Sequence, residues 1–241
     1  MLIPTNTLEF FKWVKERSEH YWSKEFQDSI ASKDEIYKCE KWIIGAKWTG
    51  LTESQIEEVE KKYQVTFTNE HKAFLQILHS IDRKEVNEHL EEDPFFYHWL
   101  RDEEEIRYRM NWAFEQILFD ILNPRCDFWL KSWGEKPESK QEKEHIFEEQ
   151  FAKSPQLLPI ISHRFIVNDH QNKQNPILSI WGNDTIVYGQ NFRNYLLNEI
   201  GVHLNLSIKE RKERDKIIAK AVKNKEYQNI PFWGEILDAN F

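Results

Sequence analysis

The chain has 241 residues, of which 40% are hydrophobic and 31% are charged, and its net charge is −8 (33 Lys and Arg against 41 Asp and Glu). This mixture is typical of a folded globular protein and excludes a disordered chain. The acidic balance argues against general nucleic-acid binding, and no apolar run approaches the ~20 residues that cross a bilayer.

Two features indicate the cellular compartment. Cys39 and Cys126 are far apart and lack metal-ligand spacing, so we interpret them as ordinary thiols in a reducing environment. The first residues, MLIPTNTLEFFKWVKER, have no basic start, apolar stretch or small-residue cleavage site, and we expect no secretory signal there. We therefore expect a cytoplasmic location.

The first third of the chain predicts helices around one strand. Apolar residues at helical spacing indicate one or two helices over residues 2–30, and residues 34–48 have a strand-like pattern. Thr52 and Gln55 form a capping box, which predicts a helix with a buried face of Ile56, Val59 and Tyr63.

A second helix is predicted to begin near Thr68 and to carry Phe74, Ile77, Leu78 and Ile81 on one face. The acidic stretch that follows, up to Asp93, is interpreted as a loop or an exposed helix. A long helix is then expected from about Glu103 to Asn123, because Pro124 disfavours the helical conformation in the residue before it.

The pattern changes in the second half of the chain. A partly extended segment (126–133), a polar connector (134–143) and a helix to about residue 153 precede it. Short runs rich in branched residues then predict strands at 157–161, 164–167, 177–181 and 185–188, with turn residues at 182–184 between the last two. Asn191 is a candidate cap for the helix that follows.

Ser207 and Glu210 form a second capping box, opening a mixed-charge helix with Ile208, Ile217, Ile218, Ala221 and Val222 on its apolar side. The apolar tail at 230–237 is expected to dock on the body. Helices around a short cluster of strands predict an α+β fold, with a small, mostly antiparallel sheet and helices packed around it.

Catalytic signatures are missing from the sequence. It has no G-x-S-x-G elbow, no phosphate-binding loop and no H-E-x-x-H motif. His71 and His79 lie two helical turns apart, too far for one metal, and we interpret them as solvated. His163, Asp169 and His170 leave two interpretations open, a metal or acid–base site and ordinary polar residues at a strand end.

Charge is distributed unevenly along the chain. Residues 82–105 hold ten acids and three bases, whereas residues 207–226 hold eight bases and four acids. We interpret the basic segment as a solvated face rather than a nucleic-acid site. The acidic segment lacks the alternating ligands of a calcium loop, which leaves a solvated face or a surface that meets a basic partner. Tryptophans are expected in the core by default, with one or two as interface anchors.

Five blocks resemble, in order, the SUKH superfamily, which is named in part after yeast cell-wall-synthesis regulators. The first is WTGLTESQIEEVEKKYQVTFTNEHKAFLQIL, and the last two are NPILSIWGNDTIVYGQNFRNYL and PFWGEIL. Gln64 stands where the family usually has a helix-ending glycine, Thr68 where it often has proline, and His79–Ser80 where an Asn–Gly pair is common. The blocks cover residues 48–78, 128–137, 157–166, 175–196 and 231–237.

The resemblance implies an α+β protein-binding module with no catalytic residue, cofactor or metal ligand to carry over. It also implies a SUKH-like domain over residues 48–241, on which residues 1–47 would pack as a helical extension. Bacterial members of the superfamily look like immunity proteins, which bind and neutralise a cognate toxin encoded beside them.

Three hypotheses for the function follow. The first is a cytoplasmic immunity protein for a bacterial toxin, for instance a nuclease. The second is a regulator or scaffold that binds housekeeping proteins, and the third is a metal-dependent hydrolase that uses His163, Asp169 and His170. We expect a protein partner, with no direct nucleic-acid or membrane binding and no enzymatic activity. The predicted partner-binding residues are Glu91, Glu92, Asp93, Asp102, Glu103, Glu104 and Glu105.

Overall fold

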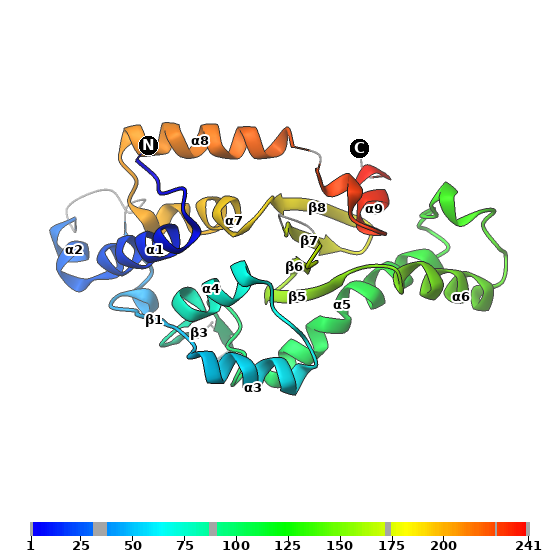
Figure 1. Cartoon of the computed structure of the whole chain (residues 1–241), viewed down its shortest axis with the longest axis horizontal. Coiled ribbons are helices and arrows are strands. Elements are labelled where there is room, and N and C mark those ends of the chain that lie inside the picture. Colours follow the sequence, from blue (N-terminus) through cyan, green and yellow to red (C-terminus); the bar gives the residue numbers. More distant parts are fainter. Residues whose placement is uncertain (1, 31–37, 87–90, 172–174, 225, 240–241) are drawn as a thin grey trace. The chain divides into compact units, whose positions relative to one another are not determined.

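The computed structural model describes residues 2–30, 38–86, 91–171, 175–224 and 226–239. Its backbone contacts divide the chain into two compact units, each made of two separate stretches of sequence. The first unit contains residues 1–102 and 192–220, and the second contains residues 103–191 and 221–241. Helices surround small antiparallel sheets, so the predicted α+β class is confirmed (Figure 1).

The first unit is mainly helical and holds two short antiparallel ladders, β1–β2 and β3–β4. Residues 1–47, predicted as an extension, lie within this unit, and the predicted SUKH-like domain includes parts of both units. Its elements are α1 (Thr7–Trp22), α2 (Lys24–Ser29), η2 (Lys41–Ile43), β1 (Trp48–Thr49), α3 (Glu53–Tyr63), α4 (Asn69–Leu78), β2 (Ser80–Ile81), β3 (Lys84–Val86), β4 (Glu92–Pro94), α7 (Phe192–Glu199), η4 (Gly201–Leu204) and all but the last two residues of α8 (Ile208–Val222).

Side-chain caps begin helices of this unit, and aromatic rings pack its segments together. The Thr52–Gln55 capping box begins α3, and Thr68 caps α4 by accepting from the His71 N–H group. Aromatic rings then join distant segments. The Phe74 ring on α4 lies 5.9 Å from Phe11 on α1 and stacks at 4.2 Å on Phe192 of α7. Burial of these rings stabilises the unit by the hydrophobic effect.

The second unit is built on a four-stranded antiparallel sheet in the order β5-β6-β7-β8. The predicted hairpin is confirmed: β7 and β8 pair around a turn in which Gly182 has φ 62°, a left-handed conformation that favours glycine. The elements of this unit are α5 (Glu103–Leu122), η3 (Lys131–Trp133), α6 (Lys140–Phe151), β5 (Gln156–Ile161), β6 (Arg164–Asn168), β7 (Ile177–Trp181), β8 (Asp184–Gly189), η5 (Glu226–Asn229) and α9 (Trp233–Ala239).

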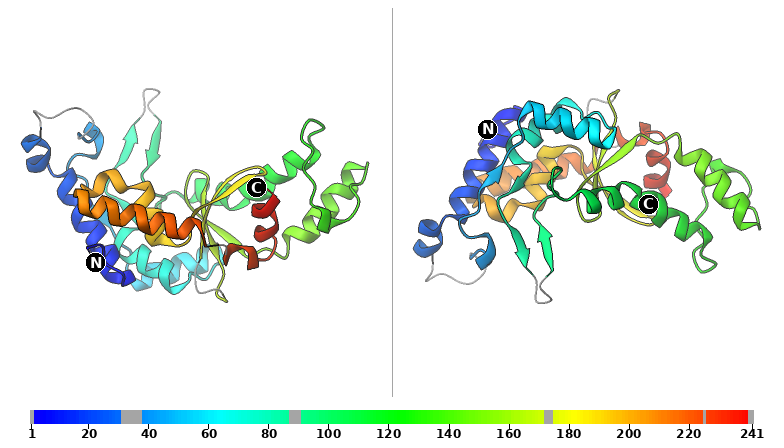
Figure 2. Two further views of the ribbon diagram at one scale, coloured as in Figure 1. Left: turned by 90° about the horizontal axis from the view of Figure 1, so that it is seen from above. Right: turned by 90° about the horizontal axis from the view of Figure 1, so that it is seen from below.

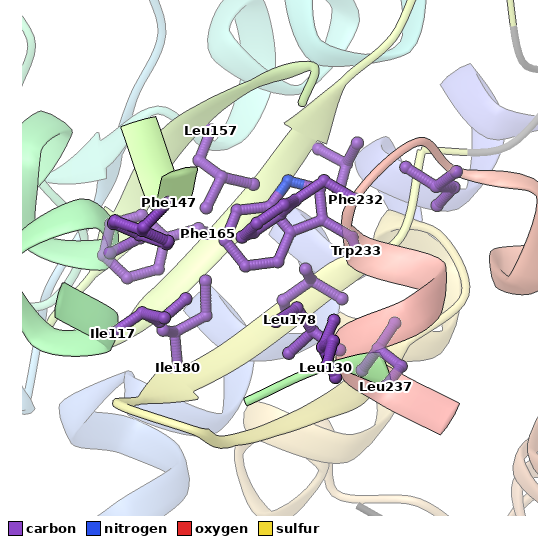
Figure 3. Packing of buried hydrophobic residues seen from close by; sticks show 14 of the residues in the cluster. Ile117, Leu130, Phe147, Leu157, Phe165, Leu178, Ile180, Phe232, Trp233 and Leu237 are labelled. Atoms are coloured by element: carbon purple, nitrogen blue, oxygen red, sulfur yellow. The ribbon is translucent and has the colours of Figure 1, made fainter. Parts of the chain in front are cut away.

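One apolar cluster fills the second unit, and α5, α6 and the C-terminal tail all contribute to it. Trp233 of the tail is completely buried, which confirms that this segment docks on the body. Figure 3 shows the cluster: Ile117, Leu130, Phe147, Leu157, Phe165, Leu178, Ile180, Phe232, Trp233 and Leu237.

Three predictions about the elements are wrong. Residues 38–47 form no strand, and residues 34–37 of that predicted strand lie outside the described part of the chain. The acidic stretch is a two-stranded hairpin, β3–β4, instead of a loop or helix. Ile81, expected on the face of α4, belongs to β2 because the helix ends at Leu78.

Helix α8 also differs from its prediction. The Ser207–Glu210 capping box is present, with a 2.7 Å bond from the Ser207 N–H group to the Glu210 carboxylate. No described residue of this helix is buried, however, so its expected apolar side does not enter a core. Acids and bases at the intervening positions keep the whole helix at the surface.

Candidate functional site

The β3–β4 hairpin holds several acidic residues at defined positions of a strand ladder. Its ladder pairs Lys84 with Pro94, Glu85 with Asp93 and Val86 with Glu92. Figure 2 shows the two strands extending away from the helices of their own unit. Because successive side chains of a strand alternate between its faces, Glu92 and Asp93 occupy opposite faces. The sequence prediction had placed these two neighbours on one surface.

One face of the hairpin concentrates negative charge, and we call Glu40, Glu85 and Asp93 the acidic face. Glu85 and Asp93 are directly opposite each other in the ladder. Partial burial raises the pKa of Glu85, and the charges of Glu40 and Asp93 raise it further. The indole N–H group of Trp42 donates to the Glu40 carboxylate at 2.6 Å and holds it in place. Glu40 and Glu85 were absent from the predicted site, because only the folded chain brings residue 40 to the hairpin and only the ladder register places Glu85 opposite Asp93.

The opposite face of the hairpin borders a pocket of ≈ 330 Å³. Lys84, Glu92, His98, Arg101 and Asp102 are among its lining residues. The Lys84 ammonium group lies 2.8 Å from Oδ1 of Asp102, and the His98 backbone N–H group donates to Oδ2 at 2.8 Å. The Asp102 side chain is only 6% exposed. Its carboxylate therefore holds the hairpin and the 98–102 turn together and is not displayed to a partner.

Two buried histidines lie in the first unit, and the prediction that His71 and His79 are solvated is wrong. His71 begins the buried face of α4, three and seven residues before Phe74 and Leu78, so its helical spacing was the missed signal. Nε2 of His79 accepts the Trp99 N–H group at 2.9 Å, which places the ring proton on Nδ1. Burial, aided by the neighbouring His98, lowers the pKa of His79 to about 3.

Of the other predicted acids, Glu91 is exposed and immediately precedes β4 in the first unit, and Glu103, Glu104 and Glu105 begin α5 in the second unit. Glu103 pairs with Arg107 at 2.9 Å and Glu105 with Arg109 at 2.7 Å, each one turn along the helix, while Glu104 is exposed. Acids in the first helical turn are favoured by the helix dipole. The structure therefore places these three residues in a different compact unit from the acidic face, with a local structural role for two of them.

A patch of aromatic rings and one arginine adjoins this helix start. The Arg109 guanidinium lies 4.6 Å from the centroid of the Trp112 ring and 5.4 Å from that of Tyr108. Trp181 packs 5.7 Å from Trp112 and is 59% exposed, an exception to the core placement expected for tryptophan. Tyr108 is 47% exposed. Exposed Trp, Tyr and Arg side chains are the types most enriched at interface hot spots.

The residues considered for a hydrolase are engaged in local contacts. Nδ1 of His163 lies 3.1 Å from the Ser162 hydroxyl, and the imidazole ring packs edge-on against Trp181. Oδ1 of Asp169 accepts the Gln171 N–H group at 2.8 Å. Within the described ranges, no three His, Cys, Asp or Glu side chains are grouped so that they could hold a metal ion.

Comparisons with known proteins give no match: no family model, curated protein or solved structure resembles the chain significantly. Within the part of the chain that the structure describes, no helix has the length and apolar character needed to cross a membrane. The acidic face is therefore interpreted from its own geometry and charge.

Proposed function

We propose that this chain is a SUKH-type immunity protein that acts in the cytoplasm and neutralises a cognate bacterial toxin by binding it through the acidic face. The five sequence blocks in family order support this proposal. So does the geometry at Gln64, which adopts a left-handed conformation (φ 56°) at the end of α3, where the family usually has glycine.

The observation that carries the proposal is the direct opposition of Glu85 and Asp93 in the β3–β4 ladder. Like charges directly opposite each other destabilise an antiparallel pair, and a two-stranded ladder has little stability to spare. A basic partner would convert this repulsion into attraction. The pair is therefore better explained by binding than by folding.

The chemistry of the partner follows from the sign of the charge. A surface that binds nucleic acid is basic, and an acidic face can occupy the place of the phosphate backbone. Exposed complementary charges also accelerate association, in a manner that salt weakens. A nuclease toxin therefore fits the acidic face.

Co-expression tests the function directly. The gene beside the one that encodes this chain is expressed alone and together with it, and cell survival is compared. The proposal expects the neighbour to be toxic alone and harmless in the presence of this chain. Toxicity that the chain fails to relieve would overturn it.

A double substitution tests the acidic face itself. Glu85→Gln with Asp93→Asn removes the repulsion, so we expect the free energy of unfolding to stay the same or to rise by up to about 1 kcal/mol. Association of this variant with the toxin should nevertheless be at least about tenfold slower at low salt than association of the unaltered chain. Stopped-flow association and urea unfolding measure the two effects.

The matched control is Glu103→Gln with Glu104→Gln, which removes the same charge from the start of α5. We expect this variant to associate nearly as fast as the unaltered chain. If the control slows association and the hairpin variant does not, the binding surface lies on the second unit and the acidic face is not the site.

A second candidate function, a scaffold for housekeeping proteins, is favoured by the exposed Trp181–Tyr108–Arg109 patch. Such a patch would give the second unit a binding surface of its own. Pull-down at native salt with the unaltered chain and a Trp181→Ala variant tests it. Partners that depend on Trp181 but not on Glu85 and Asp93 would support the scaffold.

A further inference from the structure

Helix α8 is a long surface helix whose acidic residues are all occupied by internal contacts. The Glu210 carboxylate binds the Arg17 guanidinium at 3.1 Å, and Asp215 pairs with Arg214 at 2.8 Å. Glu213 accepts the Leu2 backbone N–H group at 2.9 Å. Two of the three acids are therefore paired with arginines, and Glu213 keeps its charge while its carboxylate binds the backbone of the N-terminal segment.

The lysines of the same helix are left facing solvent. Lys209, Lys212, Lys216 and Lys220 are all exposed, and no ion pair joins any of them to another described residue. Their spacing of three, four and four residues places them on one side of the helix over roughly 16 Å. We call these four residues the lysine stripe.

Exposed aliphatic side chains flank the lysine stripe on both sides. The Leu2 backbone N–H group binds the Glu213 carboxylate, which is one turn from both Lys209 and Lys216, and Leu2 is 53% exposed. Ile208 precedes Lys212 by one turn on the other side and is 69% exposed. Lysines and exposed aliphatic residues are the two kinds of side chain with which a surface-bound helix meets an anionic membrane.

We propose that the lysine stripe of α8 binds the surface of an anionic lipid bilayer, with Leu2 and Ile208 entering the boundary between headgroups and acyl chains. Lysines near an anionic surface each contribute favourably, and their field extends about one Debye length, roughly 8–10 Å, so a local stripe acts despite the net charge of −8. This binding is peripheral and needs no membrane-spanning helix, and it departs from the sequence-based expectation of no membrane binding. It is also independent of the toxin proposal.

The aliphatic flanks favour lipid over nucleic acid. A phosphate backbone would satisfy the lysines but would give Leu2 and Ile208 nothing apolar to contact. Stripe residues are all lysine, which binds phosphate as a point charge, and none is an aromatic residue on which a base could stack. An anionic bilayer surface offers both the negative headgroups that the lysines bind and the apolar region that Leu2 and Ile208 can enter.

Vesicle sedimentation of the full chain tests the proposal. The probes are phosphatidylcholine vesicles with and without phosphatidylglycerol, at low and at physiological salt. We expect binding only to vesicles that contain phosphatidylglycerol, weakened by salt. Changing Lys209, Lys212, Lys216 and Lys220 to Gln should lower the partition coefficient at least about tenfold.

A charge-matched control separates the stripe from net charge. Changing Lys12, Lys61, Lys131 and Lys140 to Gln gives the same net charge as the stripe variant, −8 − 4 = −12, and removes exposed lysines from other helices and a 3-10 turn. This control should bind vesicles at least about tenfold better than the stripe variant. Ile208→Asn, which changes no charge, should weaken vesicle binding about two- to tenfold.

Folding of each variant is checked by circular dichroism, and α8 contributes no described buried side chain that the substitutions could disturb. Equal vesicle binding by the stripe variant and the control would overturn the proposal. So would binding of the unaltered chain to duplex DNA without binding to phosphatidylglycerol vesicles, or unchanged vesicle binding by Ile208→Asn.

Discussion

At the scale of single residues, buried polar groups fix the segment that carries the candidate site. His79 accepts the Trp99 N–H group, and Asp102 accepts the His98 N–H group while it binds Lys84. Each bond replaces a hydrogen bond that water would otherwise make, and loss of one partner leaves a buried group unsatisfied. These contacts connect the end of α4 to the turn that follows the hairpin.

The pH dependence of stability tests the role of His79. In the unfolded chain His79 takes up a proton as the pH falls below its ordinary pKa of 6.5, whereas in the folded chain it stays neutral until about pH 3. The unfolded state therefore binds more protons in this interval, and the free energy of unfolding falls as the pH falls. We expect a loss from His79 on the order of 1–2 kcal/mol between about pH 7 and pH 5.

Urea unfolding of a His79→Gln variant at both pH values isolates this contribution. The comparison cancels other groups, including Glu70, whose pKa burial raises to about 7. Stability of the variant should depend less on pH than that of the unaltered chain. His145→Gln, at an exposed position, serves as the control, and equal pH slopes in all three proteins would contradict the assignment.

The left-handed residue at the end of α3 gives a second prediction. Gln64 has φ 56° and ψ 44°, which costs a residue with a Cβ atom about 1 kcal/mol relative to glycine. We expect Gln64→Gly to raise the free energy of unfolding by about 0.5–1 kcal/mol in urea. Gln64→Ala should give no such gain, because alanine retains the Cβ atom.

At the scale of elements, the same capping motif begins one helix with a buried face and another without one. Capping boxes open both α3 and α8, but α3 buries Ile56, Val59 and Tyr63 whereas no described side chain of α8 is buried. A cap satisfies backbone groups of the first turn only. The burial of a helix depends on what packs against it, which the cap does not determine.

The Thr52 cap should be measurable in the stability of the chain. Its hydroxyl accepts the Gln55 N–H group at 3.3 Å, and the Gln55 side chain accepts the Thr52 N–H group at 2.9 Å. Thr52→Ala should lower the free energy of unfolding by about 1 kcal/mol in urea. Thr52→Ser, which keeps the hydroxyl, should retain most of it, and equal losses in both variants would contradict the capping role.

At the scale of the whole molecule, the chain passes between its two compact units more than once. Phe192 follows the whole sheet of the second unit, yet it stacks on Phe74 at 4.2 Å in the first unit and also contacts Phe11. The C-terminal tail likewise completes the core of the second unit. Each core therefore depends on residues from distant parts of the sequence.

Phe192→Ala tests this dependence. The side chain is fully buried among other rings, so its removal should cost about 3–5 kcal/mol of unfolding free energy. Phe119→Ala is the matched control, since Phe119 is 65% exposed and should cost less than about 1 kcal/mol. Thermal and urea unfolding followed by tryptophan fluorescence measure both.

Much of the fold could be predicted because its signals are local. The capping boxes at Thr52 and Ser207 and the turn at Gly182 each depend on residues a few positions apart. The β3–β4 hairpin was not predicted because charged residues occupy both faces of its strands, so the sequence shows no alternation of apolar and polar residues there. Burial of His71 was missed because a histidine interrupts an otherwise apolar helical face.

The candidate site could be predicted only in part. Acidic residues near position 93 were identified from composition, but their separation onto two faces required the register of the ladder. Glu40 joined Asp93 and Glu85 through the folding of a distant segment, and Asp102 was removed from the surface by its bond to Lys84. The α+β class, most helix starts and the β7–β8 hairpin could be predicted from the sequence alone, since these depend on short-range periodicity and capping. Which charges are paired, buried or displayed could be seen only in the folded chain, because that depends on contacts between residues far apart in the sequence.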